Sequence, residues 1–175
     1  VNYRANIWAL REAGVGVVLA TAAVGSLNQE MQPGEIILVD QFLDFTKSRP
    51  ITFYEGGEVG VLHVDVTNPY CTSVCQHLKE TAGRLQIGVH SKGTYVCTEG
   101  PRYETAAEIR MFQMLGGDLV GMTSVPEVVL AREVGLCYAT LALVTNYAAG
   151  ISPNPLSHRE VVEVMGRIAR PARTL

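Results

Sequence analysis

The chain has 175 residues, of which 47% are hydrophobic and 18% are charged, which is enough to bury the core of one globular domain. Its formal net charge is -3, and it has no cluster of Lys and Arg of the kind that forms a nucleic-acid surface. Its longest apolar stretches, such as 15–20 and 136–144, are too short to cross a bilayer. Composition therefore argues against nucleic acid and membrane as partners and favours a small molecule.

The first predicted element is a helix that starts abruptly within residues 2–10, without an initiator Met, a clear cap or a signal peptide. Gly14 follows this helix and suits its left-handed C-cap. Because the helix has no proper beginning, we expect the chain to be truncated at its N-terminus, with part of any site preceding Val1.

Strands and helices then alternate along the chain. Apolar runs predict strands at 15–21, 36–39, 61–64, 88–97, 119–122 and 137–144. Helical patterns are found at 72–82, 104–115, 125–134 and from about 158 onward. The alternation predicts a single α/β domain over residues 1–175, with a mixed, mostly parallel central sheet flanked by helices on both faces.

The chain has four cysteines, Cys71, Cys75, Cys97 and Cys137, and no two of them form a C-x-x-C motif. They are too few and too scattered for a disulfide framework, so we expect reduced core thiols and, from that, a cytoplasmic location. Cys71 and Cys75 lie about one helical turn apart and could ligate a metal, although helix packing explains them more simply. The four histidines lack metal-ligand spacing, so no metal site is predicted.

Ligands of open α/β sheets bind beyond the carboxyl ends of the strands. The segments at such positions are 21–26, 99–104, 122–124 and 145–147. The first consists of small residues, so its backbone N–H groups could approach an oxyanion, although tight strand packing explains it equally well.

The segment 121–132 predicts a strand that leads into a helix N-terminus. Ser124 and Glu127 fit an S-x-x-E capping box, and Pro126 lies in the first helical turn. Ser124 is then occupied by the helix, which leaves the hydroxyl of Thr123 free beside the positive helix end. Thr123 could bind a phosphate or simply form a hydrogen bond with the preceding loop.

Other polar residues near strand ends have both structural and functional interpretations. Glu104 could complement a helix dipole or accept a hydrogen bond in a pocket, with Tyr103 packed on a flat heterocycle. Met122 fits the core or a substrate wall. Asn146 ends the most apolar strand and needs partners for its amide, so a ligand role is favoured there. His158 suits the surface of a helix start or a loop-presented ligand contact.

Three motifs in this order and spacing closely resemble the trimeric purine nucleoside phosphorylase and methylthioadenosine phosphorylase family. They are Glu99-Gly100-Pro101-Arg102-Tyr103-Glu104-Thr105, Gly121-Met122-Thr123-Ser124-Val125-Pro126-Glu127-Val128 and Val144-Thr145-Asn146-Tyr147. The resemblance extends over essentially the whole chain. It implies the phosphorylase fold and phosphorolysis, in which inorganic phosphate attacks the anomeric carbon of a purine nucleoside and releases the base and ribose 1-phosphate. It implies no metal or organic cofactor.

The resemblance also assigns site residues. Thr123, Thr21 and the backbone around Ala23 would bind phosphate, Met122 would pack against the ribose and Tyr103 against the base, and the catalytic pair Glu104 and Asn146 would contact the purine edge. A carboxylate accepts a hydrogen bond from N1–H of a 6-oxopurine but repels the N1 lone pair of adenine, and Asn146 can donate to N7 or O6. An Asp in place of Asn146 resembles the 6-aminopurine branch. We therefore expect 6-oxopurine nucleosides as substrates.

The group at the 5′ position is less determined by the motifs. His158 resembles a histidine near the 5′-hydroxyl in the purine nucleoside branch, whereas Phe53, Tyr54 and His63 lie in segments that resemble the methylthio branch. In that branch the segment of His63 reaches the pocket of a neighbouring subunit, which implies a homotrimer or a dimer of trimers. Inosine or guanosine is the first expectation, with methylthioinosine or methylthioadenosine as the alternative.

Two departures from the family pattern bear on phosphate binding. The family's N-terminal glycine-containing loop and its Arg and His phosphate contacts would precede Val1. Ala22 stands where Asn or Thr is commoner, so only its backbone is available. A non-catalytic nucleoside-binding protein on the same fold, or a hydrolase that uses water, would be the competing classes.

Overall fold

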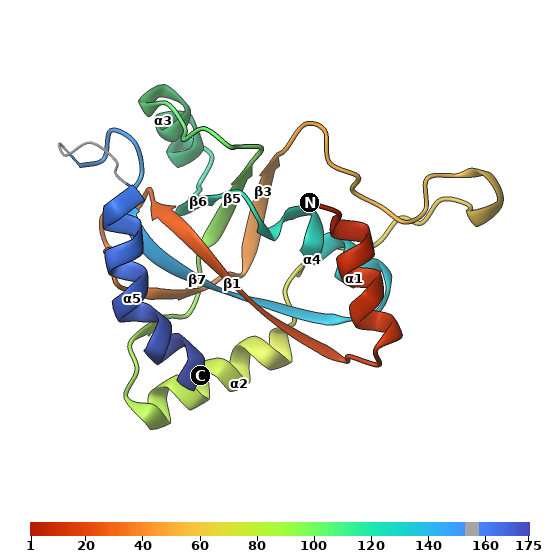
Figure 1. Ribbon diagram of the computed structural model, residues 1–175, viewed down its shortest axis with the longest axis horizontal. Helices are drawn as coiled ribbons and strands as arrows, with labels where there is room; N and C mark the ends of the chain where they lie inside the picture. The colour runs from red at the N-terminus through yellow and green to blue at the C-terminus, as the bar shows by residue number, and fades with distance from the viewer. Residues whose placement is uncertain (153–157) are drawn as a thin grey trace.

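Seven strands form one mixed sheet in the computed structural model, which describes residues 1–152 and 158–175, with residues 158 and 160 described by their backbone alone. The strand order is β3-β5-β6-β1-β7-β2-β4 (Figure 1). The strands are β1 Val17–Ser26, β2 Ile36–Leu38, β3 Gln41–Phe45, β4 Val89–His90, β5 Thr94–Thr98, β6 Leu119–Gly121 and β7 Cys137–Tyr147. The helices are α1 Tyr3–Glu12, the short 3-10 helix η1 Gly57–Val59, α2 Thr72–Leu85, α3 Ala106–Met114, α4 Ser124–Glu133 and α5 His158–Thr174.

The predicted fold class is confirmed by the pairing of these strands. Parallel pairs join β1 to β7, β2 to β4, β3 to β5 and β5 to β6, whereas β1 with β6 and β2 with β7 are antiparallel. Parallel strands need helical crossovers, and these cover both faces of the sheet. The sheet is therefore mixed and mostly parallel, as the alternation of elements predicted.

The alternation of side chains along β7 divides the core into two layers. Ala142 and Val144 face the cluster that contains α1 and α4, while Leu141 and Leu143 face the cluster that contains α2 and α5. This is the period-2 pattern of a strand buried on both faces. Figure 1 shows β7 and β1 crossing the centre of the molecule, with α2 and α5 on one side and α1 and α4 grouped at one end.

Several element boundaries differ from the predictions. The predicted small-residue loop at 21–26 is the second half of β1, because β7 pairs with β1 along its whole length. The predicted strand at 61–64 is irregular and mostly exposed, and it lies in the long connection that extends away from the body between β3 and α2 (Figure 1). β3 was not predicted, and α2 continues past Gly83 to a left-handed Gln86 at φ 56°.

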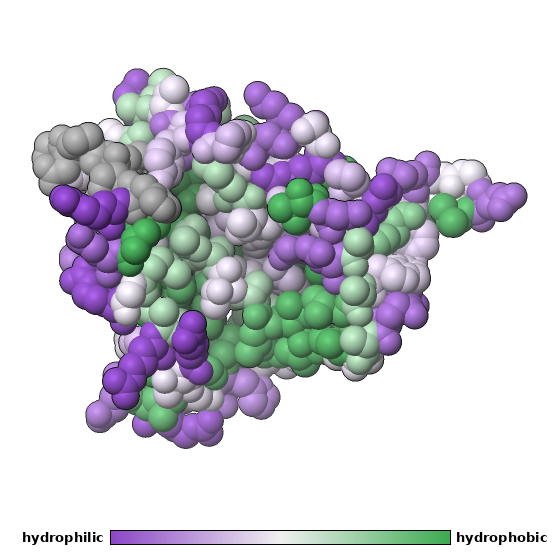
Figure 2. All heavy atoms as spheres, in the orientation of Figure 1, coloured by the Kyte–Doolittle hydropathy of each residue, from purple (hydrophilic) through white to green (hydrophobic). Residues whose placement is uncertain are grey.

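One edge of β1 is open over its first half. β6 pairs with β1 only at Gly25 and Ser26, and no other pairing occupies that side among the described strands. Val17 and Leu19 on this half are 50% and 52% exposed. Figure 2 shows hydrophobic side chains gathered on the face where β1 and β7 cross below α1. β1 is thus paired on both sides only at its carboxyl end, and one of its two sides is open near its start.

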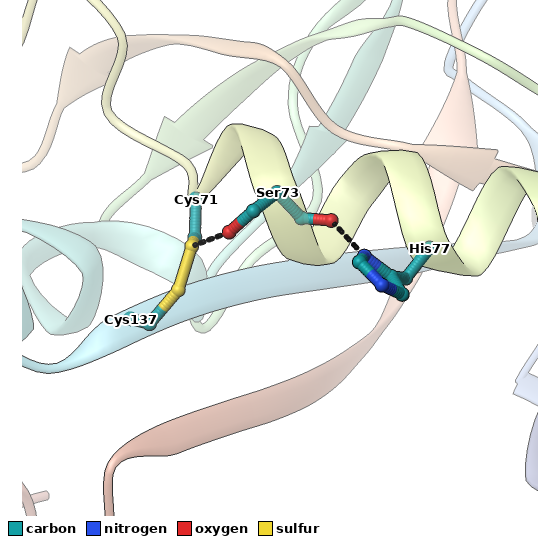
Figure 3. Close-up of a disulfide and its surroundings, with 4 residues drawn as sticks. All are labelled: Cys71, Ser73, His77 and Cys137. Carbon is teal, nitrogen blue, oxygen red and sulfur yellow. Dashed lines mark hydrogen bonds between the residues drawn. A yellow bond between two sulfur atoms is a disulfide. The ribbon is translucent and has the colours of Figure 1, made fainter.

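The expectation of four reduced thiols is wrong, because Cys71 and Cys137 form a disulfide. Packing of α2 against β7 brings their Cα atoms to 5.3 Å, inside the range for this bond, although 66 residues separate them in the sequence. Figure 3 shows the Ser73 hydroxyl donating to the sulfur of Cys71 at 3.3 Å and Nδ1 of His77 donating to the Ser73 carbonyl at 2.8 Å. Cys75 and Cys97 are free.

Among the described residues, no helix is both long enough and apolar enough to cross a bilayer.

Candidate active site

A cavity of about 270 Å³ lies where β1, β6 and β7 end near the 103–104 loop. Most of the predicted site residues meet on its wall, namely Ala23, Tyr103, Glu104, Met122, Thr123 and Asn146. The rest of the apolar lining comes from β1, β6, the residues after β7 and α5, namely Val24, Gly25, Val120, Gly121, Ala148 and Val161. Segments separated by more than a hundred residues therefore converge on one hollow of a size that suits a small ligand.

Asn146 lies at the carboxyl end of β7 and is 7% exposed. The register between β1 and β7 shifts here, since Val24 pairs with Val144 but Gly25 pairs with Asn146. Its Oδ1 accepts a hydrogen bond from the Thr145 hydroxyl at 2.8 Å, and its Nδ2 donates to the Tyr147 carbonyl at 2.9 Å. The Tyr147 carbonyl can only accept, so it fixes Nδ2 as the donor end of the amide and leaves one N–H of the amide for a ligand. The Thr145 hydroxyl has one proton, which also points to the Val24 carbonyl at 3.1 Å.

Gly25 leaves room for the amide of Asn146. A Cβ at Gly25 would lie 3.3 Å from Nδ2 of Asn146, tighter than ordinary contact. A larger residue at this position of β1 would therefore push the amide of Asn146 by a few tenths of an ångström.

Glu104 follows β5 and is held by a hydrogen bond from the Thr98 hydroxyl to its Oε1 at 2.7 Å. Its other oxygen is available to a donor in the cavity. Tyr103 is 47% exposed at the rim, so its ring offers an open aromatic face. Thr98 lies one residue before the motif that begins at Glu99. Nothing in the sequence indicated its role, because a Thr at the end of a strand is common in any sheet.

The capping box predicted at Ser124 and Glu127 is wrong. Ser124 is buried and its hydroxyl is hydrogen-bonded to the hydroxyl of Tyr70 at 2.8 Å, while Glu127 accepts from Tyr138 at 2.7 Å. Val125 has extended dihedral angles, so helical geometry in α4 begins at Pro126. Because the extended residue directly before this helical segment is Val125, Ser124 does not lie at its N-cap position.

A capping box is present in the structure at a different helix. Thr105 accepts from the Glu108 N–H at 3.1 Å, and the Glu108 carboxylate accepts from the Thr105 N–H at 2.7 Å. Arg102 forms two hydrogen bonds to the same carboxylate, which lower the pKa of Glu108 to about 2. This box anchors α3 directly after the residues that line the cavity.

Thr123 is exposed to the cavity and its backbone is held by a buried tyrosine. The Thr123 N–H donates to the Tyr95 hydroxyl at 3.1 Å, and the two hydroxyls are 3.4 Å apart. Burial raises the pKa of Tyr95 to about 12, so this phenol stays neutral. Position 121 next to this phenol requires a glycine, because a Cβ there would overlap the Tyr95 hydroxyl. Sequence reasoning missed Tyr95, whose position in a buried strand resembles any core aromatic.

Three predicted site residues are not placed in the cavity. Thr21 is exposed two residues before Ala23 on the same face of β1, about 7 Å along the strand, and does not line the cavity. His63 is exposed on the protruding 60–66 segment, away from the cavity. The side chain of His158, at the start of α5, lies outside the described residues.

The charged side chain that lines the cavity among the described residues is acidic. Glu104 supplies the negative charge, and no Lys, Arg or His lines the cavity among the described residues. No group of three or more His, Cys, Asp or Glu residues is arranged as a metal site in the described part of the chain. The site as described can recognise a polar planar ring through a carboxylate and an amide, and can offer a hydroxyl and backbone to an anion.

The fold and the site define a nucleoside phosphorylase class of protein, and the sequence comparison agrees. The family model described as Phosphorylase superfamily matches residues 1–175, so the chain belongs to this superfamily.

The chain is similar to curated members of this superfamily. It is 63% identical over 175 residues to the probable 6-oxopurine nucleoside phosphorylase of Moorella thermoacetica, covering 100% of the chain and 67% of that relative. It is 58% identical over 170 residues to the 6-oxopurine nucleoside phosphorylase of Pyrococcus furiosus, covering 94% of the chain and 64% of that protein. The S-methyl-5'-thioadenosine phosphorylase of the same organism is 50% identical over 165 residues, covering 94% and 63%. The chain thus spans about two thirds of the length of these relatives.

A solved structure has the same fold as this chain. The methylthioadenosine phosphorylase from Schistosoma mansoni in complex with adenine superposes with a TM-score of 0.95 at 36% identity, covering 99% of this chain and 68% of that one. The recognition of the family from three short motifs is therefore confirmed.

Proposed function

We propose that the protein catalyses phosphorolysis of 6-oxopurine nucleosides, with inosine and guanosine as substrates. The observation that carries the proposal is the convergence of Glu104, Asn146 and Thr123 on one cavity in a chain of this superfamily. Relatives at 54% to 63% identity carry the name 6-oxopurine nucleoside phosphorylase, which supports the same substrate class.

In the proposed reaction an oxygen of inorganic phosphate forms a bond to C1′ while the bond from C1′ to N9 breaks. The purine leaves with the electron pair of that bond and takes up a proton, giving the free base and ribose 1-phosphate. The sugar passes through a cationic, oxocarbenium-like state, and negative charge builds up on the base. A site gains rate by stabilising that charge more than it stabilises the bound substrate.

Glu104 and Asn146 have the hydrogen-bonding capacity for the base. The free oxygen of Glu104 accepts from N1–H of a 6-oxopurine, and the remaining N–H of Asn146 donates to N7 or O6 as negative charge develops. The bond from Nδ2 to the Tyr147 carbonyl keeps the amide oriented with its donor available. Adenine would place a lone pair against the carboxylate, so it is disfavoured.

Phosphate and ribose occupy the other part of the cavity in this proposal. Thr123 donates its hydroxyl to phosphate, the backbone near Ala23 contributes from β1, and Met122 packs against the ribose. Thr21 lies outside the cavity and has no part in this arrangement. Phosphate is the co-substrate, and we propose that neither a metal ion nor an organic cofactor takes part. Because the chain spans about two thirds of its relatives, further phosphate ligands would come from the part of the longer proteins beyond the match.

The 5′ group, the assembly and the location are further parts of the proposal. We place inosine before methylthioinosine, and we keep the latter as the second candidate because relatives named probable S-methyl-5'-thioinosine phosphorylase are 54% to 56% identical. We propose a homotrimer or a dimer of trimers, in which the exposed segment of His63 contacts a neighbouring pocket. A cytoplasmic enzyme of purine salvage fits this chemistry, although the disulfide removes the argument from reduced thiols.

The test is phosphate-dependent release of hypoxanthine from inosine by the full-length protein. We expect hypoxanthine and ribose 1-phosphate in equal amounts, and no release when phosphate is omitted. Release without phosphate would indicate a hydrolase, and tight nucleoside binding without turnover would indicate a non-catalytic binding protein. Comparing kcat/KM for inosine and methylthioinosine in the same assay decides the 5′ preference.

A further inference from the structure

Arg49 is a buried cation behind the cavity. It follows β3 in the long polar connection, and its side chain is only 7% exposed. One amino group of the guanidinium, Nη1, donates to the Val125 carbonyl at 2.6 Å and to the Cys97 sulfur at 3.7 Å. The other, Nη2, donates to the carbonyls of Thr98 at 3.0 Å and Glu99 at 3.1 Å.

The remaining N–H group of Arg49, at Nε, lies 3.7 Å from Oε2 of Glu99. The four N–H groups at Nη1 and Nη2 thus have hydrogen-bond acceptors, and the carboxylate of Glu99 is at ion-pair distance from Nε, which together lower the cost of burying this charge. Glu99 is itself fixed, because its carboxylate accepts from the Lys47 N–H at 2.7 Å and the Ser48 hydroxyl at 3.1 Å, and these bonds lower its pKa. The ring of Tyr3 lies 5.2 Å from the guanidinium carbon.

The carbonyls that Arg49 holds belong to the two segments that line the cavity. Thr98 begins the segment that leads to Tyr103 and Glu104, and its hydroxyl holds Glu104 at 2.7 Å. Val125 lies two residues after Thr123 in the other segment. Arg49 itself does not line the cavity. The guanidinium therefore bridges the two segments from behind, without access to a bound nucleoside.

A lysine could not replace this bridge. The guanidinium is a rigid planar fork whose donors diverge toward both segments, whereas an ammonium offers three donors from a single point. Lysine at position 49 would keep the buried charge but would lose the simultaneous bonds to Thr98 and Val125.

We propose that Arg49 is a positioning residue of the phosphorylase site, which sets the separation between the base-binding carboxylate of Glu104 and the phosphate-binding hydroxyl of Thr123. The inference rests on the proposed function. Arg49 is linked to Glu104 through the carbonyl and the hydroxyl of Thr98. It is linked to the segment of Thr123 through the carbonyl of Val125. Nucleoside binding and phosphate binding are then coupled through one side chain that touches neither substrate.

The test compares Arg49→Lys with Arg4→Lys in the full-length protein. Arg4 is a suitable control, because its Nη1 also bonds a loop carbonyl, that of Thr52 at 3.4 Å, and a carboxylate, that of Glu55 at 2.9 Å, at an exposed position. Assays run well below the melting temperature of each variant. For Arg49→Lys we expect KM to rise at least about 10-fold for both inosine and phosphate, and the inosine-to-adenosine ratio of kcat/KM to fall by a similar factor. Arg4→Lys should change none of these.

A merely structural role predicts a different result, in which Arg49→Lys lowers the melting temperature and the active fraction but leaves both KM values and the substrate ratio unchanged. That result would overturn the proposal. Thr98→Val provides a second variant, since it removes the 2.7 Å hydroxyl bond to Glu104 and the longer 3.4 Å bond of the same hydroxyl to the Gly121 carbonyl. It keeps the Thr98 carbonyl that Arg49 holds. We expect it to raise KM for inosine and lower the substrate ratio while KM for phosphate stays constant, and an unchanged inosine KM would contradict the proposed route.

Calorimetric dissociation constants for hypoxanthine, adenine and phosphate separate this proposal from the proposed function. If the wild-type protein bound hypoxanthine without turnover, the function would fail, and a weaker and less selective binding by Arg49→Lys would still support the positioning role. If Arg49→Lys bound hypoxanthine, adenine and phosphate as the wild type does, the positioning role would fail whatever the activity.

Discussion

The two ends of β7 differ in what they contribute to the molecule. At its start, Cys137 is joined to Cys71 of α2, and the neighbouring Tyr138 donates to Glu127 of α4. At its other end, nine residues and about 30 Å away, Asn146 lies in the cavity. The first end fastens helices to the sheet, and the second places a polar side chain on the wall of the cavity.

Because the two ends make different contacts, we expect stability and substrate recognition to be separable along this strand. Changes near Cys137 should alter the free energy of unfolding and leave the substrate ratio alone, whereas changes around Asn146 should do the reverse. Changes that move both properties together would break the comparison.

The largest change in activity should come from a substitution in the cavity at the carboxyl end of β7. Glu104→Ala removes the carboxylate that accepts N1–H, so we expect kcat/KM for inosine to fall on the order of 1,000-fold. The melting temperature should change little, because Glu104 has one internal hydrogen bond from Thr98. Glu163→Ala, at an exposed position of α5, serves as the control and should retain full activity. Loss of less than about 10-fold for Glu104→Ala would contradict its role.

The next effect tests the other end of β7. Cys71→Ser combined with Cys137→Ser removes a cross-link across 66 residues, for which the loop-entropy model gives about 4 kcal/mol of stability. We expect a lower melting temperature by calorimetry and an unchanged inosine-to-adenosine ratio. Peptide mapping without reductant should find the two cysteine peptides linked. A substrate ratio that changed with the cross-link would show that the two ends are coupled.

A smaller effect should follow removal of the phosphate-binding hydroxyl. Thr123→Val deletes one neutral hydrogen bond, so KM for phosphate should rise by up to about 10-fold while the dissociation constant for hypoxanthine stays the same. Steady-state kinetics at varied phosphate and calorimetry with hypoxanthine measure the two quantities. A hypoxanthine affinity that fell as far as the phosphate affinity would place Thr123 in the base pocket instead.

The smallest effect concerns pH and the start of α3. The folded-state pKa of Glu108 is lowered to about 2 by Arg102, so its contribution to stability is present above the unfolded pKa of about 4.3 and is lost as the pH falls toward 2. Glu108→Gln removes the charge, and we expect a slightly lower melting temperature than the wild type at pH 7. The two melting curves should converge near pH 2. A difference that persisted there would indicate a cause other than the charge.

The elements of the fold could be predicted where a local pattern determines them. The apolar run of β7 and the Gly14 stop of α1 are such cases, and both are present. The second half of β1 was predicted as a loop because Ala22, Ala23 and Gly25 have no strong strand propensity. Pairing with β7 makes this segment a strand, and no local signal contains that pairing.

The residues that line the cavity could be predicted from the sequence more fully than the residues that hold them in place. Asn146, Glu104 and Thr123 lie at strand ends, where chain order and family motifs indicate ligand contacts. The Thr98 hydroxyl bonds Glu104 six residues away only because the loop between them turns back, and Arg49 bonds Val125, which is 76 residues away in the sequence. Neither contact is recorded by a spacing pattern in the sequence. The same reason explains the wrong prediction for the cysteines, since the approach of Cys71 to Cys137 depends on how α2 packs on β7.

The inosine-to-adenosine ratio of kcat/KM, measured for the full-length protein and for Asn146→Asp, tests the central claim most directly. An aspartate would accept a hydrogen bond from the exocyclic amine of adenine and would repel O6 of hypoxanthine. We predict that the wild type prefers inosine and that Asn146→Asp lowers the ratio at least about 10-fold, while Asn68→Asp at an exposed loop position leaves it unchanged. An unchanged ratio in Asn146→Asp would contradict the assignment of Asn146 to recognition of the purine.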